Sequence, residues 1–201
     1  MCRPSFNDEG LSVFSIAADA VHIDPRELAA RLGADAEGAA AVLLEQQMGE
    51  LRKAAVCRAV CRVVPVATEG PHCTLGGLLA PVSQTLARSL SGCRRAYLFA
   101  ATLGLGVDRL IARQGALSAA GQFMLDAAAS ALIEGVCDHV QAGLPAVTAA
   151  RCSPGYGDFD LEHQERLLHA LHAERTIGLT LTEKKLMVPT KSVSAVIGIK
   201  T

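Results

Sequence analysis

The sequence contains few aromatic residues and no tryptophan. Aromatic side chains make up 3% of the 201 residues, yet half of the residues are hydrophobic. Such a chain folds into a globular protein rather than remaining disordered. Its core must be built mainly from Ala, Leu and Val. The length suits one domain with a sizeable core, or one domain with a small helical appendage.

The sequence also lacks an excess of either charge and lacks long apolar runs. The formal net charge is −1, which gives no electrostatic attraction to nucleic acid or to an anionic membrane. No window of about 18 apolar residues is free of charge, so no membrane span is expected. Residues 1–10 contain no apolar run of the kind that marks a signal peptide.

The cysteines lack the spacing of a disulfide framework. There are seven, an odd number, and without a secretory signal we expect reduced thiols and a cytoplasmic protein. Cys57 and Cys61 form a lone C-x-x-x-C pair, which two buried apolar side chains explain better than a metal site. Cys152 follows Arg151, whose charge would lower the pKa of the thiol. Because no histidine is placed beside it as a base, we interpret Cys152 as a buried or spectator residue.

No motif indicates a phosphate loop, a zinc centre or a paired-carboxylate hydrolase. Gly104 and Gly106 follow an apolar run over residues 96–101 and resemble the start of a dinucleotide-binding fingerprint. However, Arg109 occupies the position of the third glycine. The segment is therefore predicted to be a buried strand with a tight turn into a helix.

Hydrophobic periodicity predicts a mixture of helices and strands. Residues 24–27 (Asp-Pro-Arg-Glu) form a capping box that would open a helix. The longest helix is expected over residues 118–143. Pro65 would place a strand over 58–66 at an edge of the sheet. The other expected elements are helices at 39–54, 83–90 and 161–173 and strands at 73–79, 177–182 and 192–199.

The stretch from Arg151 to Gly157 combines a cation with a sharp loop. Pro154 and the glycines on either side of Tyr156 exclude regular structure there. Arg151 presents a planar fork that suits a carboxylate in two places, and Tyr156 has no bulky neighbour in sequence to cover its ring. These features are consistent with an ordinary turn beside a surface arginine, or with a grip for a small zwitterionic ligand.

Polar residues also line one face of the predicted helix over 118–143. Ser130, Glu134 and Asp138 follow one another at i, i+4 spacing, and no Lys or Arg occurs between residues 115 and 150. Like charges at this spacing repel by a few tenths of a kcal/mol. The pattern is consistent with a solvated acidic stripe, or with an acid that binds a cation such as the amino group of a ligand.

A second polar face occurs on the predicted helix over 161–173. Glu165, His169 and His172 lie at spacings that a metal ion can use. A polar face opposite a leucine stripe needs no ligand to explain it, so no metal site is predicted.

Four motifs in a fixed order resemble a known family. They are R-x-x-x-G-Y at 151–156, E-H at 162–163, I-G-L-x-L-T at 177–182 and M-x-P-x-x-S-V-S at 187–194. Together they resemble the S-adenosylmethionine-binding activation domain of cobalamin-dependent methionine synthase, in its short stand-alone form. The resemblance implies a single α+β domain with a central, largely antiparallel sheet flanked by helices. We expect an N-terminal helical segment over residues 1–60 that packs on a core over 61–201.

The resemblance also implies a ligand and the residues that bind it. Arg151 would hold the carboxylate of S-adenosylmethionine, and Glu134 would balance its positive charge. The loop residues that would line the ligand or the corrinoid face are Ser153, Pro154, Gly155 and Tyr156. No catalytic residue and no metal ligand is expected.

The implied role is the reactivation of a partner protein. The family's domain presents S-adenosylmethionine to a cobalamin held by a different domain. After an electron donor such as a flavodoxin has reduced the inactive cob(II)alamin, the methyl group restores methylcobalamin. We therefore expect a cobalamin-binding methyltransferase of the methionine synthase type as partner, and no catalysis by this chain alone.

Two positions depart from the family pattern. A ligand-contacting aspartate falls near Gly33, with Asp35 as a neighbouring candidate. The chain ends at Thr201, before a segment whose tyrosine pair touches the ligand, so the expected site is weaker or is completed by a partner. Two other interpretations stay open. One is a corrinoid-protein adaptor or chaperone without S-adenosylmethionine binding, and the other is an independent methyltransferase or hydrolase that uses Cys152.

Overall fold

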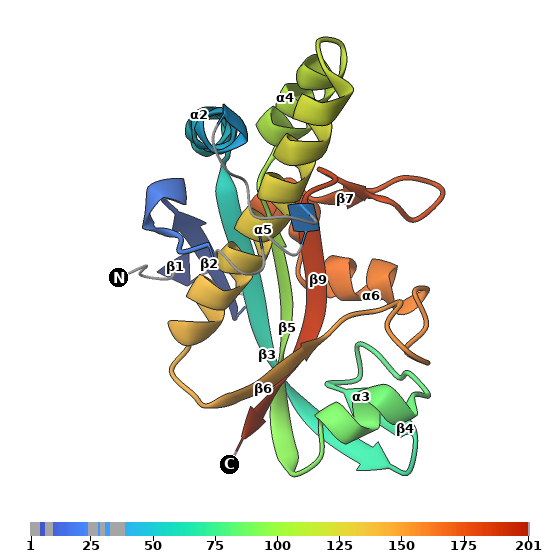
Figure 1. Ribbon diagram of the computed structural model, residues 1–201. Helices are drawn as coiled ribbons and strands as arrows, with labels where there is room; N and C mark the ends of the chain where they lie inside the picture. The colour runs from blue at the N-terminus through green and yellow to red at the C-terminus, as the bar shows by residue number, and fades with distance from the viewer. Residues whose placement is uncertain (1–4, 7–9, 24–27, 29–30, 33–38, 201) are drawn as a thin grey trace.

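A seven-stranded sheet forms the centre of the molecule (Figure 1). The computed structural model describes residues 5–6, 10–23, 28, 31–32 and 39–200. The strand order is β1-β2-β3-β5-β9-β6, and β4 pairs with the C-terminal end of β3. The strands are β1 Ser5–Phe6, β2 Leu11–Ile16, β3 Cys57–Glu69, β4 His72–Leu75, β5 Cys93–Thr102, β6 Thr148–Cys152 and β9 Ser192–Lys200.

Every pairing between the described strands is antiparallel. Two further short strands, β7 Thr180–Leu181 and β8 Met187–Val188, form a separate hairpin. This arrangement confirms the expected α+β fold with a largely antiparallel sheet.

Helices cover both faces of the sheet, and Figure 1 shows α5 crossing one face while α6 lies against the other. The first face carries η1 Ala18–Ala20, α2 Ala39–Ala54, α4 Leu105–Gly115 and α5 Ala119–Ala142. The second face carries α3 Gln84–Ser89, α6 His163–Ala170 and α7 Ala173–Ile177.

The central strand β5 shows why two layers of helices are needed. Its side chains alternate between the two faces, as the pleat requires. Tyr97 and Phe99 enter the core under α5, whereas Leu98 and Ala100 enter the core under α6 and α7. An apolar run without polar positions must be covered on both sides, so the sequence of β5 itself dictates the second layer.

The longest helix, α5, approaches its neighbours closely because its buried face is built from small residues. Ala128, Ala131 and Gly135 all lie on that face. A Cβ atom at Gly135 would lie 2.5 Å from the backbone oxygen of His22. Ser118 caps the helix by accepting a hydrogen bond from the N–H of Gly121 at 3.1 Å.

The described residues of the N-terminal part form strands as well as a helix. Residues 1–60 contain α2, but they also contain β2 and the start of β3, and residue 60 lies inside β3. Phe14 and Ile16 enter the core under α5 with the exposed Ser15 between them, and Leu11 enters the core on the other face, as suits a strand that pairs with β3. The predicted helix start at 24–27 and the two positions Gly33 and Asp35 lie outside the described residues.

The prediction that Pro65 marks a sheet edge is wrong. β3 is an interior strand, and Pro65 lies opposite Arg95 of β5. On its other side, pairing with β2 ends at Arg62 and pairing with β4 begins at Val66. The missing N–H of Pro65 therefore falls in the gap between two partner strands, where the ladder does not need it.

The segment predicted as a helix over 161–173 is divided. α6 ends at Ala170, and α7 begins after His172, whose backbone is left-handed with φ 48°. The strand predicted over 177–182 is reduced to β7, because Ile177 is still the last residue of α7. Both Ile177 and Leu179 are buried in the core under α6 and α7, so their alternation reflects burial rather than an extended strand.

A membrane crossing would need a long apolar helix, and none of the helices in the described part of the chain has that length and composition.

Candidate functional site

A hollow of about 680 Å³ lies between α5 and the edge strand β6. It is lined by Glu134, Asp138, Gln141 and Ala142 of α5, Thr148, Ala150 and Arg151 of β6, Ser153, and Val193 of β9. Three of the six predicted site residues, Arg151, Glu134 and Ser153, are therefore brought together. This volume falls in the range of about 300–1,000 Å³ that small-molecule sites occupy.

Arg151 is the centre of the hydrogen bonds in this hollow. Its Nη2 donates to Oε2 of Glu134 at 2.9 Å. Its Nη1 donates to Oδ1 of Asp138 at 2.7 Å and to Oε1 of Gln141 at 3.0 Å. Burial by itself would lower the pKa of Arg151, but the hydrogen bond to Asp138 and the charges of Asp138 and Glu134 raise the pKa overall.

The acidic face of α5 receives its cations from β6 and from the residue before β9. Glu134 and Asp138 contact Arg151, and Asp126 contacts Nζ of Lys191 at 2.8 Å. No cation lies near these acids in the sequence, but the tertiary structure brings Arg151 and Lys191 into contact with them. The signal that sequence reasoning missed is the spacing of 134, 138 and 141, which places Gln141 on the same helix face.

The loop after β6 is held in place by its own backbone and by Asp158. The N–H of Gly155 donates to the carbonyl of Phe159 at 2.7 Å. Oδ1 of Asp158 accepts hydrogen bonds from Oγ of Ser83 at 2.7 Å and from the N–H of Thr85 at 2.9 Å. These hydrogen bonds hold the pKa of Asp158 well below its usual range, and the one from Ser83 has the largest effect.

The other three predicted site residues lie outside the hollow. Pro154 is buried, Gly155 takes a left-handed backbone with φ 89°, and the side chain of Tyr156 is 68% exposed. An exposed aromatic ring is available to a ligand or to a partner surface. Their role in binding remains a prediction.

Cys152 is poorly suited to act as a nucleophile. It is 4% exposed, and burial raises the pKa of its thiol. Successive side chains of a strand point to opposite faces, so Cys152 enters the core under α6 while Arg151 contacts α5. The charge of Arg151 therefore does not lower the pKa of Cys152, contrary to the expectation from their adjacency. The six cysteines of the described residues are all free.

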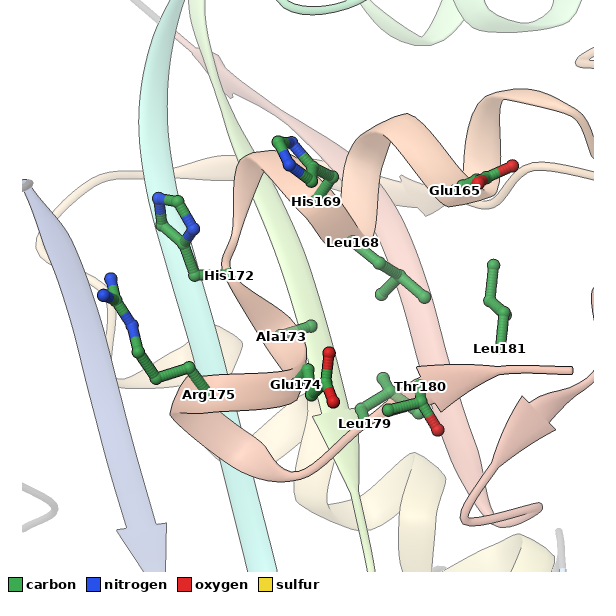
Figure 2. A pocket seen from close by; sticks show the side chains of 10 residues that line it. All are labelled: Glu165, Leu168, His169, His172, Ala173, Glu174, Arg175, Leu179, Thr180 and Leu181. Carbon is green, nitrogen blue, oxygen red and sulfur yellow. The ribbon is translucent and has the colours of Figure 1, made fainter.

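A second hollow of about 670 Å³ lies on the opposite face, between α6, α7 and β7. Figure 2 shows Glu165 and His172 at opposite ends of this hollow, with His169 between them along the chain. The ring centroids of His169 and His172 are 6.1 Å apart. Among the described residues, no group of three or more His, Cys, Asp or Glu side chains has a geometry that suits a metal ion.

The fold and the first hollow define an α+β domain whose edge strand carries an arginine among carboxylates. Residues 146–201, which include β6, the following loop and β9, match the family model described as vitamin B12 dependent methionine synthase, activation domain. The whole chain has the fold of a solved relative, a crystal structure of the MetH reactivation domain bound to AdoHcy. The TM-score is 0.70 at 15% identity, over 97% of this chain and 83% of the other. A comparison with curated protein sequences found no match.

These comparisons confirm the resemblance drawn from the four motifs. All four motifs, from Arg151 to Ser194, fall inside the matched segment. The fold match extends the likeness to the N-terminal strands, where the sequence carries no motif.

Proposed function

We propose that this domain binds S-adenosylmethionine in the hollow between α5 and β6 and presents it to a cobalamin held by a partner. The observation that carries the proposal is the position of Arg151. This residue belongs to the segment that matches the activation-domain model, and it lines a hollow of suitable size together with two carboxylates. Arginine binds the carboxylate of an amino-acid ligand, and the carboxylates bind its ammonium group.

The charges of the hollow fit this ligand. Arg151 contributes one positive charge, and Glu134 and Asp138 contribute two negative charges, so one negative charge is unmatched within this group. S-adenosylmethionine carries one carboxylate, one ammonium and one sulfonium group, and thus one net positive charge. S-adenosylhomocysteine (AdoHcy), which lacks the sulfonium charge, is the molecule bound to the solved relative.

The domain itself would bind and orient the methyl donor. Its contribution to the rate would be the position of the sulfonium methyl group and the exclusion of water from it. The partner's corrinoid would supply the reaction, in which cobalt reduced by one electron takes the methyl group and S-adenosylhomocysteine leaves. The electron would come from a donor such as a flavodoxin.

The first test measures binding and the second measures reactivation. Isothermal titration should detect binding of S-adenosylmethionine and of S-adenosylhomocysteine by the isolated domain. The domain should then be mixed with a cobalamin-loaded methionine synthase fragment, a chemical reductant and S-adenosylmethionine. We expect the methylcobalamin spectrum to appear only in the complete mixture. Methyl transfer to a small acceptor by the isolated domain would contradict the proposal and favour an independent enzyme.

A second candidate is an adaptor or chaperone of a corrinoid protein that does not bind S-adenosylmethionine. The observation in its favour is that Arg151 already has three acceptors within the protein, as a purely structural arginine would. An adaptor would bind the cobalamin-carrying partner without any response to S-adenosylmethionine. The titration therefore distinguishes the two candidates.

A further inference from the structure

Gln141, in the last turn of α5, connects the side chain of Arg151 to the backbone of its own strand. Its Oε1 accepts a hydrogen bond from Nη1 of Arg151 at 3.0 Å. Its Nε2 donates to Oγ1 of Thr148 at 2.8 Å and to the carbonyl of Ala149 at 2.9 Å. The amide group therefore bonds on both of its sides.

The orientation of this amide follows from the chemistry of its neighbours. A guanidinium group has only donors, so the group that faces it must be the oxygen. The NH₂ group then faces two acceptors, and both of its hydrogens have a partner. Reversing the amide would place NH₂ against the guanidinium and oxygen against a carbonyl. Gln141 is thus held in one orientation.

The strand that carries Arg151 needs such a connection. Thr148 lies opposite Ile199, but Arg151 lies opposite Ile197, so three steps on β6 match two steps on β9. This bulge redirects the side chains of β6. Because β6 is the last strand of the sheet order, none of the described strands supports it from the other side. Gln141 bonds the bulge at Ala149 and the side chain of Arg151 together.

The contacts of Arg151 leave two of its five N–H donors for a ligand. Nη1 uses both of its hydrogens on Asp138 and Gln141, and Nη2 uses one on Glu134. The Nε–H and the remaining N–H of Nη2 have no partner among the described residues. A ligand carboxylate can accept charge-assisted hydrogen bonds from these donors.

We infer that Gln141 is a positioning residue, which holds Arg151 so that the remaining donors of its guanidinium receive the carboxylate of the ligand. The inference rests on the proposed function for the identity of the ligand. Gln141 acts through Arg151 and does not itself need to touch the ligand. Its effect should therefore depend on the ligand's carboxylate and on the presence of Arg151.

The experiment compares two ligands in Gln141→Ala, in a control variant and in an Arg151→Ala background. Gln141→Ala should weaken S-adenosylmethionine binding about tenfold, because a charge-assisted hydrogen bond loses its alignment. Its affinity for decarboxylated S-adenosylmethionine should change by less than about twofold. Gln122→Ala, at an exposed glutamine of the same helix outside the hollow, is the matched control and should change neither affinity. In an Arg151→Ala background, Gln141→Ala should cause no further loss.

A measurement without ligand separates this inference from the proposed function. In the parent protein, NMR of the Arg151 side chain should show slow rotation of the guanidinium group. Gln141→Ala should accelerate that rotation, and Thr148→Val, which removes one acceptor of Gln141, should do so more weakly. Equal loss of affinity for both ligands, or unchanged rotation, would overturn the inference. If the parent binds neither ligand, the proposed function fails, and the inferred role fails with it even where the rotation changes as expected.

Discussion

The guanidinium of Arg151 lies 2.9 Å from the carboxylate of Glu134, across 17 positions of the sequence. The cation comes from the edge strand β6, and the acid comes from the middle of α5. Their side chains are 19% and 33% exposed, so the pair is neither fully solvated nor deeply buried. The ion pair fixes the orientation of both side chains in the lining of the hollow.

The pair changes what a substitution at Arg151 should do. Arg151→Lys keeps the charge but cannot reproduce a fork with contacts in three directions. We expect S-adenosylmethionine binding to fall about tenfold to a hundredfold, and somewhat more in Arg151→Ala. Titration calorimetry measures the affinity, and thermal melting measures the cost of leaving two carboxylates without their cation. Unchanged affinity in both variants would remove Arg151 from the site.

Glu134→Gln should have a smaller effect. Arg151 keeps Asp138 and Gln141 as acceptors, so we expect a change of less than about 1 kcal/mol in the free energy of unfolding. The hollow would lose its unmatched negative charge, and S-adenosylmethionine should therefore lose more affinity than S-adenosylhomocysteine. Equal affinities of parent and variant for both ligands would show that Glu134 does not contribute to binding.

Salt should distinguish the same two ligands in the parent protein. S-adenosylmethionine carries one more positive charge than S-adenosylhomocysteine, and Asp138 is 69% exposed, so part of the attraction is open to screening. We expect the affinity for S-adenosylmethionine to fall more steeply than the affinity for S-adenosylhomocysteine between about 0.05 M and 0.5 M salt. Titrations at several salt concentrations measure the two slopes. Parallel slopes would mean that the charge balance of the hollow does not select the sulfonium ligand.

Acid should weaken the loop after β6 through Asp158. Its pKa is lowered in the folded protein, first by the hydrogen bond from Ser83. The stabilisation is therefore complete above the unfolded pKa and is lost as the pH falls below about 4 towards the lower folded value. Asp158→Ala should melt at a lower temperature than the parent at pH 7, and the difference should shrink below about pH 4. Melting curves that stay parallel down to pH 2 would contradict this assignment.

Gly157 should tolerate no larger side chain. Its backbone is left-handed with φ 60°, and a Cβ atom there would lie 2.5 Å from Oγ1 of Thr85. A left-handed backbone alone costs a residue with a Cβ about 1–2 kcal/mol, so Gly157→Ala should lower the free energy of unfolding by more than this. Gly70→Ala is the control, because Gly70 has φ 58° with no atom within 4 Å of the added Cβ. Urea unfolding measures the free energy of unfolding of both variants. In the double variant Gly157→Ala/Thr85→Ala the clash is relieved, so its loss of stability should approach that of Gly70→Ala.

Local sequence patterns predicted many of the elements and the resemblance to the activation domain. The apolar run of β5 and the long apolar face of α5 predict a buried strand and a long helix, because both patterns are local consequences of the pleat and of the helical repeat. The motifs between Arg151 and Ser194 identify the activation-domain resemblance for the same reason, since each is a short contiguous stretch. The first motif indicates Arg151 as a candidate ligand contact, and the polar face of the helix together with the resemblance indicates Glu134.

Only the tertiary structure decided how these residues meet. Arg151 and Glu134 were expected to bind opposite charges of a ligand, but in the structure they bind one another, because β6 folds back along α5. The role of Gln141 depends on a bulge in β6 and on the edge position of that strand, and neither is encoded in a local pattern. Pairing across a sheet and packing of a helix on it are set by contacts distant in sequence, and periodicity carries no information about them.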